Sequence, residues 1–204
     1  LAKTAKACVS CSGITAPDDK PVWAASASKL TPETPVTLSW VNPQAQKFEI
    51  ILSIDKDYLI TAQQRFTNGG TASAQVAPFG LVSRSSLPKD PDTWNIHVGP
   101  MGVFNGSADY DWDYDDVAEA PKGEVDFKST GGWLGFTDKY WLAAVIPDQK
   151  TAINAKFRAA NGTYQTQMVS ATQTMVNPGQ QVTSSSRLFA GAKEVEVLDN
   201  YPDK

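Results

Sequence analysis

Hydrophobic residues recur at every second position through much of the chain, which is the spacing of β-strands that bury one face. The first clear run places Val36, Leu38 and Trp40 on one side of a strand, and similar runs follow to Ile54 and Phe66. Turn-forming residues, including Asn-Gly pairs, separate the runs. The pattern predicts about a dozen strands and an all-β fold, a large antiparallel β-sandwich.

The most apolar stretch covers residues 131–148 and is predicted to be the central hairpin of the fold. Residues 140–146 carry no charge, so this strand is expected to be covered on both faces. A polar break at residues 137–139 separates the two strands, and Pro147 ends the second because proline cannot donate to the ladder. The predicted structural core of the hairpin consists of Trp133, Tyr140 and Trp141.

Acidic and aromatic residues alternate between Asp109 and Asp116. On a strand this spacing places the rings on one face and the carboxylates on the other, so the block is predicted to be a half-buried strand. A calcium-binding loop is a second interpretation, but Tyr114 and Ala120 occupy the positions where that loop needs glycine and glutamate. A third is a surface that binds a partner or a sugar, consisting of Tyr110, Asp111, Trp112, Asp113 and Tyr114.

The two ends of the chain differ in composition from its middle. Residues 1–33 are rich in Ala, Ser, Thr, Lys and Pro and are predicted to be a loosely ordered segment. Cys8 and Cys11 have the spacing of a redox pair, but no strand–helix pattern surrounds them, so a mobile tail is the preferred interpretation.

Residues 34–189 form the predicted sandwich domain, and residues 190–204 are predicted to be one short C-terminal helix that Pro202 stops. The apolar face of this helix recurs every three residues and consists of Ala192, Val195, Leu198 and Tyr201.

The composition restricts the chemistry. A net charge of −4 favours neither nucleic acid nor an acidic membrane surface as a partner. His97 is the only histidine, whereas zinc sites and most acid–base triads need more than one. No Gly-x-Ser-x-Gly motif and no phosphate-binding glycine loop occurs in the sequence. We therefore expect no catalytic residue, no metal site and no cofactor.

The sequence contains no run of the ~20 apolar residues that a membrane-spanning helix requires. It begins at Leu1 with neither an initiator methionine nor a signal-peptide pattern. We expect it to be a piece of a longer protein.

Several segments, in their order along the chain, have the sequence of a known family. These segments are Pro35–Trp40, Asp57–Leu59, Pro78–Arg84, Gly131–Asp148 and Ser186–Val195. From Leu30 to Tyr201 the ordered set resembles the large periplasmic domain of the bacterial YidC membrane-protein insertases.

This resemblance implies a galactose-mutarotase-like supersandwich in the periplasm, attached to the inner membrane by segments absent from this chain. It implies an insertase and chaperone function in membrane-protein transport. The expected partners are Sec translocon accessory components and nascent membrane proteins, docked through an edge strand or a cleft. Residues 190–204 would lead toward the membrane, with Arg187 as a charge flanking the helix. The chain itself is expected to be monomeric.

Two other functions stay open. A carbohydrate-binding or mutarotase-like sandwich would use the aromatic block as a sugar platform, although mutarotase chemistry uses a glutamate together with histidines and this chain has only His97. A structural spacer that binds nothing is the third hypothesis. We expect that the chain is not an enzyme.

Overall fold

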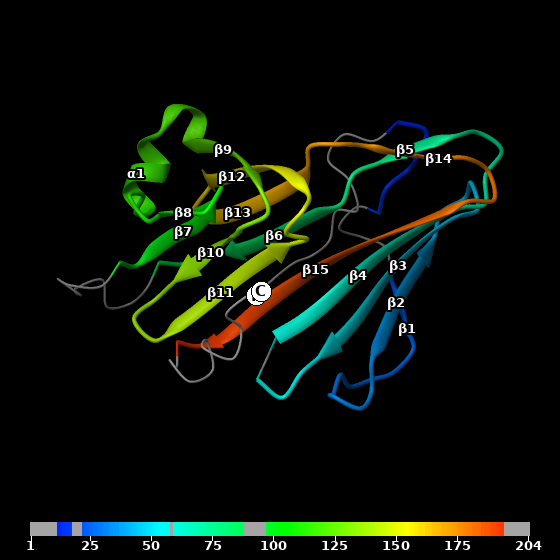
Figure 1. The fold of residues 1–204 in the computed structure, drawn as a ribbon, viewed down its shortest axis with the longest axis horizontal. Helices are drawn as coiled ribbons and strands as arrows, with labels where there is room; N and C mark the ends of the chain where they lie inside the picture. Colours follow the sequence, from blue (N-terminus) through cyan, green and yellow to red (C-terminus); the bar gives the residue numbers. More distant parts are fainter. Residues whose placement is uncertain (1–11, 18–21, 58, 88–96, 194–204) are drawn as a thin grey trace.

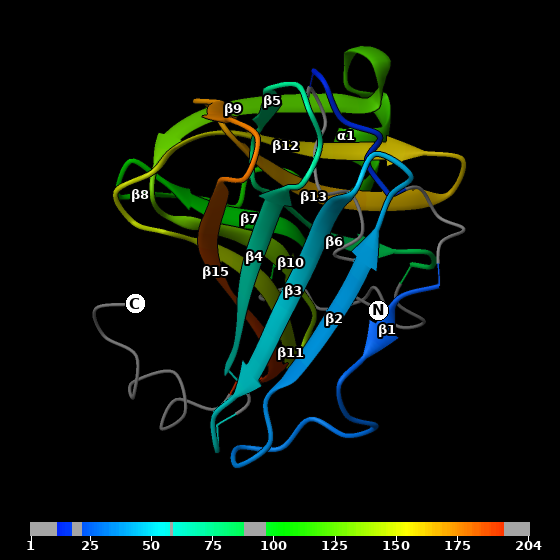
Figure 2. The ribbon, with the colours of Figure 1, turned by 90° about the vertical axis from the view of Figure 1, so that its right-hand side faces the viewer.

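A computed structural model of the chain describes residues 12–17, 22–57, 59–87 and 97–193. Two β-sheets form its layers, and Figure 2 shows their strands crossing rather than running parallel. The predicted all-β sandwich is thus confirmed. The predictions for Cys8, Cys11, Val195, Leu198 and Tyr201 lie outside the described residues.

The larger sheet has nine antiparallel strands (Figure 1). In spatial order they are β1 (Ala24–Ala25), β2 (Val36–Val41), β3 (Gln46–Ile54), β4 (Leu59–Asn68), β15 (Gln181–Ala192), β11 (Trp141–Pro147), β10 (Trp133–Thr137), β7 (Gly99–Phe104) and β8 (Ser107–Asp109). The alternating runs of the sequence become β2, β3 and β4, which follow one another as the expected meander. Strand β15, the last one described, then inserts between β4 and β11, which no local pattern indicates.

The smaller sheet has four strands, in the order β6 (Phe79–Arg84), β13 (Thr163–Ser170), β12 (Ala152–Ala160) and β9 (Glu124–Thr130). A separate two-stranded sheet pairs β14 (Thr174–Val176) with β5 (Ala74–Val76). The described residues also contain a short helix, α1 (Tyr114–Glu119), and a 3-10 turn at Pro121–Gly123. Asn105-Gly106 and Asn161-Gly162 turn two hairpins with positive φ at all four positions, as Asn-Gly hairpins require.

The main core fills the space between the two large layers. Phe157 of β12 and Leu134 of β10 have no exposed surface. The rings of Phe104 and Phe127 stack with centroids 4.2 Å apart, and Phe157 meets Phe127 edge-on at 4.8 Å. A second cluster joins the β3–β4 end of the large sheet to the two-stranded sheet and contains Phe48, Phe66, Ala74, Val76 and Val176.

The central hairpin occurs where it was predicted, as β10 and β11, and residues 144–147 are buried in succession. The assignment of Tyr140 and Trp141 to the core is wrong, because they are 65 % and 61 % exposed. Both lie at the turn that joins the two strands, at the edge of the molecule in Figure 1. Trp133 is half-buried and packs against a small cluster of Leu59, Ile146 and Phe189.

The predicted boundary between the sandwich and a C-terminal helix at residue 190 is also wrong. Residues 190–192 belong to β15 and pair with residues 141–143 of β11. Ala192 is therefore a strand residue opposite Trp141, and Arg187 lies in the middle of the same strand opposite Ile146. Their backbone groups are used by the sheet ladder, which keeps the chain extended.

Candidate functional site

Strand β15 has a neighbour on both sides for only part of its length. Strand β4 pairs with Gln181–Phe189, whereas β11 pairs only with Ser186–Ala192. No described strand continues the ladder on the β11 side of Gln181–Ser185. We call this side of Gln181–Ser185 the open edge.

The open edge exists because β11 stops early. Pro147, opposite Ser186, is the last residue of β11 in this ladder, and the chain turns away directly after it. The next residues form a turn in which the Asp148 carboxylate accepts the Lys150 N–H at 2.9 Å and the Asp148 carbonyl accepts the Thr151 N–H at 3.0 Å. This turn carries the chain into β12 of the other sheet, so the space opposite the first half of β15 stays free of a strand.

Hydrogen bonds at the two ends of β15 show which of its backbone groups face the open edge. Before β15, the Gln180 carbonyl accepts from Asn68 N–H on the β4 side at 2.9 Å; beyond its other end, Lys193 N–H donates to the Tyr140 carbonyl on the β11 side at 2.8 Å. Backbone groups of successive residues in an antiparallel strand point alternately to its two neighbours. Odd-numbered residues therefore face β11, and Thr183 and Ser185 direct their N–H and C=O groups toward the open edge.

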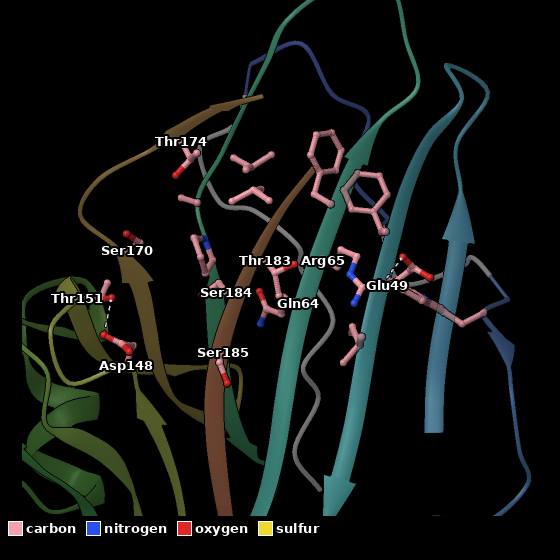
Figure 3. A pocket seen from close by; sticks show the side chains of 18 residues that line it. Glu49, Gln64, Arg65, Asp148, Thr151, Ser170, Thr174, Thr183, Ser184 and Ser185 are labelled. Carbon is pink, nitrogen blue, oxygen red and sulfur yellow. Dashed lines mark hydrogen bonds and ion pairs between the residues drawn. The ribbon is translucent and has the colours of Figure 1, made fainter. Parts of the chain in front are cut away.

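A groove of about 320 Å³ runs along this edge (Figure 3). Thr183, Ser184 and Ser185 of β15 line one side, and Asp148, Thr151, Ser170 and Thr174 line the other. At one end Phe48, Phe66, Val76 and Trp23 supply apolar surface. A further hollow of about 240 Å³ continues past Asp148 toward Arg187. The groove is thus elongated, polar along its length and apolar at one end.

Two amide side chains, the half-buried Gln64 and the buried Asn68, hold this region in shape. Gln64 of β4 donates through Nε2 to the Phe79 carbonyl at 2.7 Å and so connects the floor of the groove to the small sheet. Asn68 has no exposed surface and donates through Nδ2 to the carbonyls of Ala72 and Val176, each at 2.8 Å. The sequence predicted Asn68 only as part of a turn; its role in fixing β14 beside β15 is new.

Of the three charged side chains that line the groove, Glu49 and Arg65 form an ion pair with each other. The Glu49 carboxylate lies 2.8 Å from Lys47 Nζ and 3.7 Å from Arg65 Nη1. The lining contains no histidine among the described residues. What the groove offers is backbone hydrogen bonding, hydroxyl groups and an apolar end, which suits an extended polypeptide better than a reacting sugar.

The predicted partner surface at residues 110–114 is not a strand. Tyr110–Asp113 are irregular, and Asp113 is the N-cap of α1, accepting the Asp115 and Asp116 N–H groups at 2.8 and 2.9 Å. The carboxylates of this block cap a helix. The alternation of acidic and aromatic residues therefore does not correspond to a strand with one polar and one apolar face.

The aromatic rings of this block do not share one face. Tyr110 is 56 % exposed, Trp112 packs partly against the main core, and Tyr114 is buried in it. Burial raises the pKa of Tyr114 to about 12. Only Tyr110 remains as an exposed ring, with Asp111 and Asp113 exposed beside it.

His97 lies outside any strand, and its Nε2 is 2.9 Å from the Pro100 carbonyl. In the described part of the chain no three side chains of the metal-binding types come together to hold an ion. The described helices also include none with the length and hydrophobicity to cross a bilayer.

Comparison with known proteins gives matches over nearly the whole chain. A family model described as the YidC periplasmic domain matches residues 5–204. The insertase YidC of Zymomonas mobilis is 39 % identical over 189 residues, which cover 92 % of this chain and 33 % of that protein. The insertase YidC of Acidiphilium cryptum is 34 % identical, covering 93 % of this chain and 34 % of that protein. The chain spans about one third of the length of these curated relatives.

Solved structures resemble the fold at low sequence identity. A galactose mutarotase related enzyme from Lactobacillus acidophilus superposes with a TM-score of 0.56 and 8 % identity, covering 85 % of this chain and 72 % of the other. The galactosidase domain of an alpha-galactosidase-sucrose kinase gives a TM-score of 0.56 and 10 % identity, covering 80 % and 24 %. These likenesses establish a galactose-mutarotase-like sandwich and concern the fold alone.

Proposed function

Because the chain belongs to the YidC periplasmic domain family, we propose that it serves a membrane-protein insertase by binding extended polypeptide along the open edge of β15. The observation that carries this proposal is the free ladder position at Thr183 and Ser185, in a strand whose Ser186–Phe189 segment is paired on both sides. Strand addition to such an edge uses main-chain hydrogen bonds and is tolerant of sequence. That tolerance suits a domain whose clients differ in sequence.

The clients would be periplasmic segments of nascent membrane proteins, which emerge unfolded and extended. Accessory components of the Sec translocon are the second class of partner, bound by the same edge through an extended segment. Insertion itself belongs to the two thirds of the relatives that this chain does not cover. The chain would bind and release segments in the periplasm without chemical change, so we propose no enzymatic activity.

Weak binding is expected. Two strand residues offer four backbone groups, each hydrogen bond contributes about 1 kcal/mol net, and ordering a free peptide opposes this gain. A dissociation constant on the order of 1 mM or above is therefore expected for a short peptide. Weak, rapidly reversible binding also fits a chaperone that has to release its clients.

A direct test is fluorescence anisotropy with a labelled peptide of alternating valine and serine flanked by lysines, titrated with the chain. Saturable binding is expected, and Thr183→Pro should weaken it about tenfold because proline removes an outward N–H and blocks the edge. Proline is tolerated where the N–H faces outward, so the variant should keep its fold, which circular dichroism would verify.

Thr183→Val is the matched control, since it changes the side chain and keeps the backbone donor; it should bind like the parent chain. A peptide N-methylated at alternate amides should not bind. Equal binding by the parent and Thr183→Pro would contradict the proposal. Saturable heat with hexoses in calorimetry would favour a sugar-binding sandwich instead.

A further inference from the structure

Tyr140 and Trp141 form an exposed aromatic pair at the turn between β10 and β11. The turn is closed by a hydrogen bond from Asp138 N–H to the Trp141 carbonyl at 2.8 Å. Lys139 places Nζ 5.4 Å from the centre of the Tyr140 ring. Two large neighbouring rings held outward on a closed turn are a typical interaction surface rather than core residues.

The last described strand ends against this turn. Ala192 faces Trp141 in the ladder, and Lys193 N–H donates to the Tyr140 carbonyl at 2.8 Å. The Lys193 side chain continues over the turn and donates through Nζ to Thr137 Oγ1 at 3.0 Å. Lys139, Tyr140, Trp141 and Lys193 thus form one surface, which we call the aromatic–basic patch.

The charge of the patch is opposite to that of the whole chain, which carries −4. Asp138 is the acidic residue of the turn, and its carboxylate is held by Arg84 at 2.6 Å. Within the described residues, neither Lys139 nor Lys193 takes part in an ion pair. A hollow of about 440 Å³ beside Trp141 has polar lining at residues 83–86, while Phe136 and Leu142 give it apolar surface next to these cations.

We propose that the aromatic–basic patch rests on the surface of an anionic phospholipid bilayer. Tryptophan and tyrosine concentrate at the membrane–water interface, where the ring is partly dehydrated and its polar group stays hydrated. Lysines beside them attract anionic headgroups. The rings and cations of the patch together complement a headgroup layer.

The position of the patch supports this partner. Lys193, the last residue that the structure describes, lies directly on the patch, and the curated relatives are about three times longer than the chain. Contact of the patch with the bilayer would place Lys193 at the level of the lipid headgroups. The patch and the open edge are at opposite ends of β11, Trp141 at one and Pro147 at the other, so the two proposals are independent.

Fluorescence quenching tests the depth of Trp141. The chain is tethered through a C-terminal histidine tag to vesicles of phosphatidylethanolamine and phosphatidylglycerol that contain nickel-chelating lipid. Brominated lipid in the same vesicles should quench part of the tryptophan emission, and Trp141→Phe should abolish that quenched part while the five other tryptophans still emit. Quenching that persists in Trp141→Phe, or no quenching in the parent, would overturn the proposal.

Co-sedimentation of the untethered chain with the same vesicles tests the charge. Lys139→Glu should lower the membrane partition coefficient by more than about fivefold, because losing one lysine from an anionic surface already has that effect and glutamate adds repulsion. Lys150→Glu is the matched control, because this exposed lysine follows the other end of β11, and its binding should equal that of the parent. Equal losses of binding in both variants would show that the net charge of the chain, not the patch, drives binding. Equal binding of the parent chain to neutral phosphatidylcholine vesicles would show nonspecific adsorption, and either result would contradict the proposal.

Discussion

Phe157→Ala is expected to lower the free energy of unfolding by about 3–5 kcal/mol, the range for truncating a fully buried phenylalanine. Phe157 has no exposed surface and packs edge-on against Phe127, so its removal leaves a cavity between the two sheets. The layers cannot close around such a cavity without shifting strands that are paired on both sides. Urea unfolding followed by circular dichroism would give the value.

Trp141→Ala is the informative comparison for Phe157→Ala. The sequence alone ranks Trp141 as core, yet the structure exposes most of its side chain, so truncation should cost less than about 1 kcal/mol. A loss as large as that of Phe157→Ala would mean that Trp141 is buried and would remove the basis of the aromatic–basic patch as well.

Asn68→Ala is expected to lower the free energy of unfolding by about 2–4 kcal/mol. Its side chain donates to the Ala72 and Val176 carbonyls and accepts the Gly70 N–H at 3.1 Å, all at a fully buried position. Alanine leaves these backbone groups without their partner, which is costlier than losing an exposed hydrogen bond. Asn68→Asp should be at least as harmful at neutral pH, since it loses the donors and buries a charge.

Asn177→Ala serves as the control for Asn68, because Asn177 is exposed and its amide oxygen accepts a hydrogen bond from the Ser73 hydroxyl at 2.8 Å. Its cost should stay within about 0.5 kcal/mol. Equal destabilisation by Asn68→Ala and Asn177→Ala in the same urea titration would show that the buried amide does not hold β14 beside β15.

Alternation of apolar residues was sufficient to predict the strands of the meander and the central hairpin, because in these segments one face meets the core at every second residue. It failed at Tyr140 and Trp141, where an apolar run continues past the edge of the packed layers. How far the second sheet extends over a strand is a tertiary property that the strand's own sequence does not contain.

The block at residues 109–116 was misread for a different reason. Aspartates at alternate positions mimic the polar face of a strand, but Asp113 and Asp116 also have the spacing of a capping box, which the structure contains. The local signal for a helix start was therefore present in the sequence. Capping by Asp113 prevailed because Tyr114 and Val117 then face the main core together.

The open edge could not be predicted from the sequence, because it depends on three segments far apart in the chain. Strand β15 inserts beside β4, β11 ends at Pro147, and the Asp148 turn leads away to the other sheet. Pro147 and the serine run at residues 184–186 are the only local signs, and each has several ordinary explanations. The resemblance to the YidC family indicated the fold and the cellular setting without locating the site.

The central claim is that the first half of β15 has a free ladder position, and amide hydrogen exchange measured residue by residue with NMR tests it most directly. In the free chain the Thr183 and Ser185 amides should exchange rapidly, while the Val182 and Ser184 amides, which face β4, should exchange slowly. Addition of the extended peptide should protect Thr183 and Ser185 and leave the other two unchanged. Slow exchange at Thr183 and Ser185 without peptide would show that the edge is already occupied and would contradict the account.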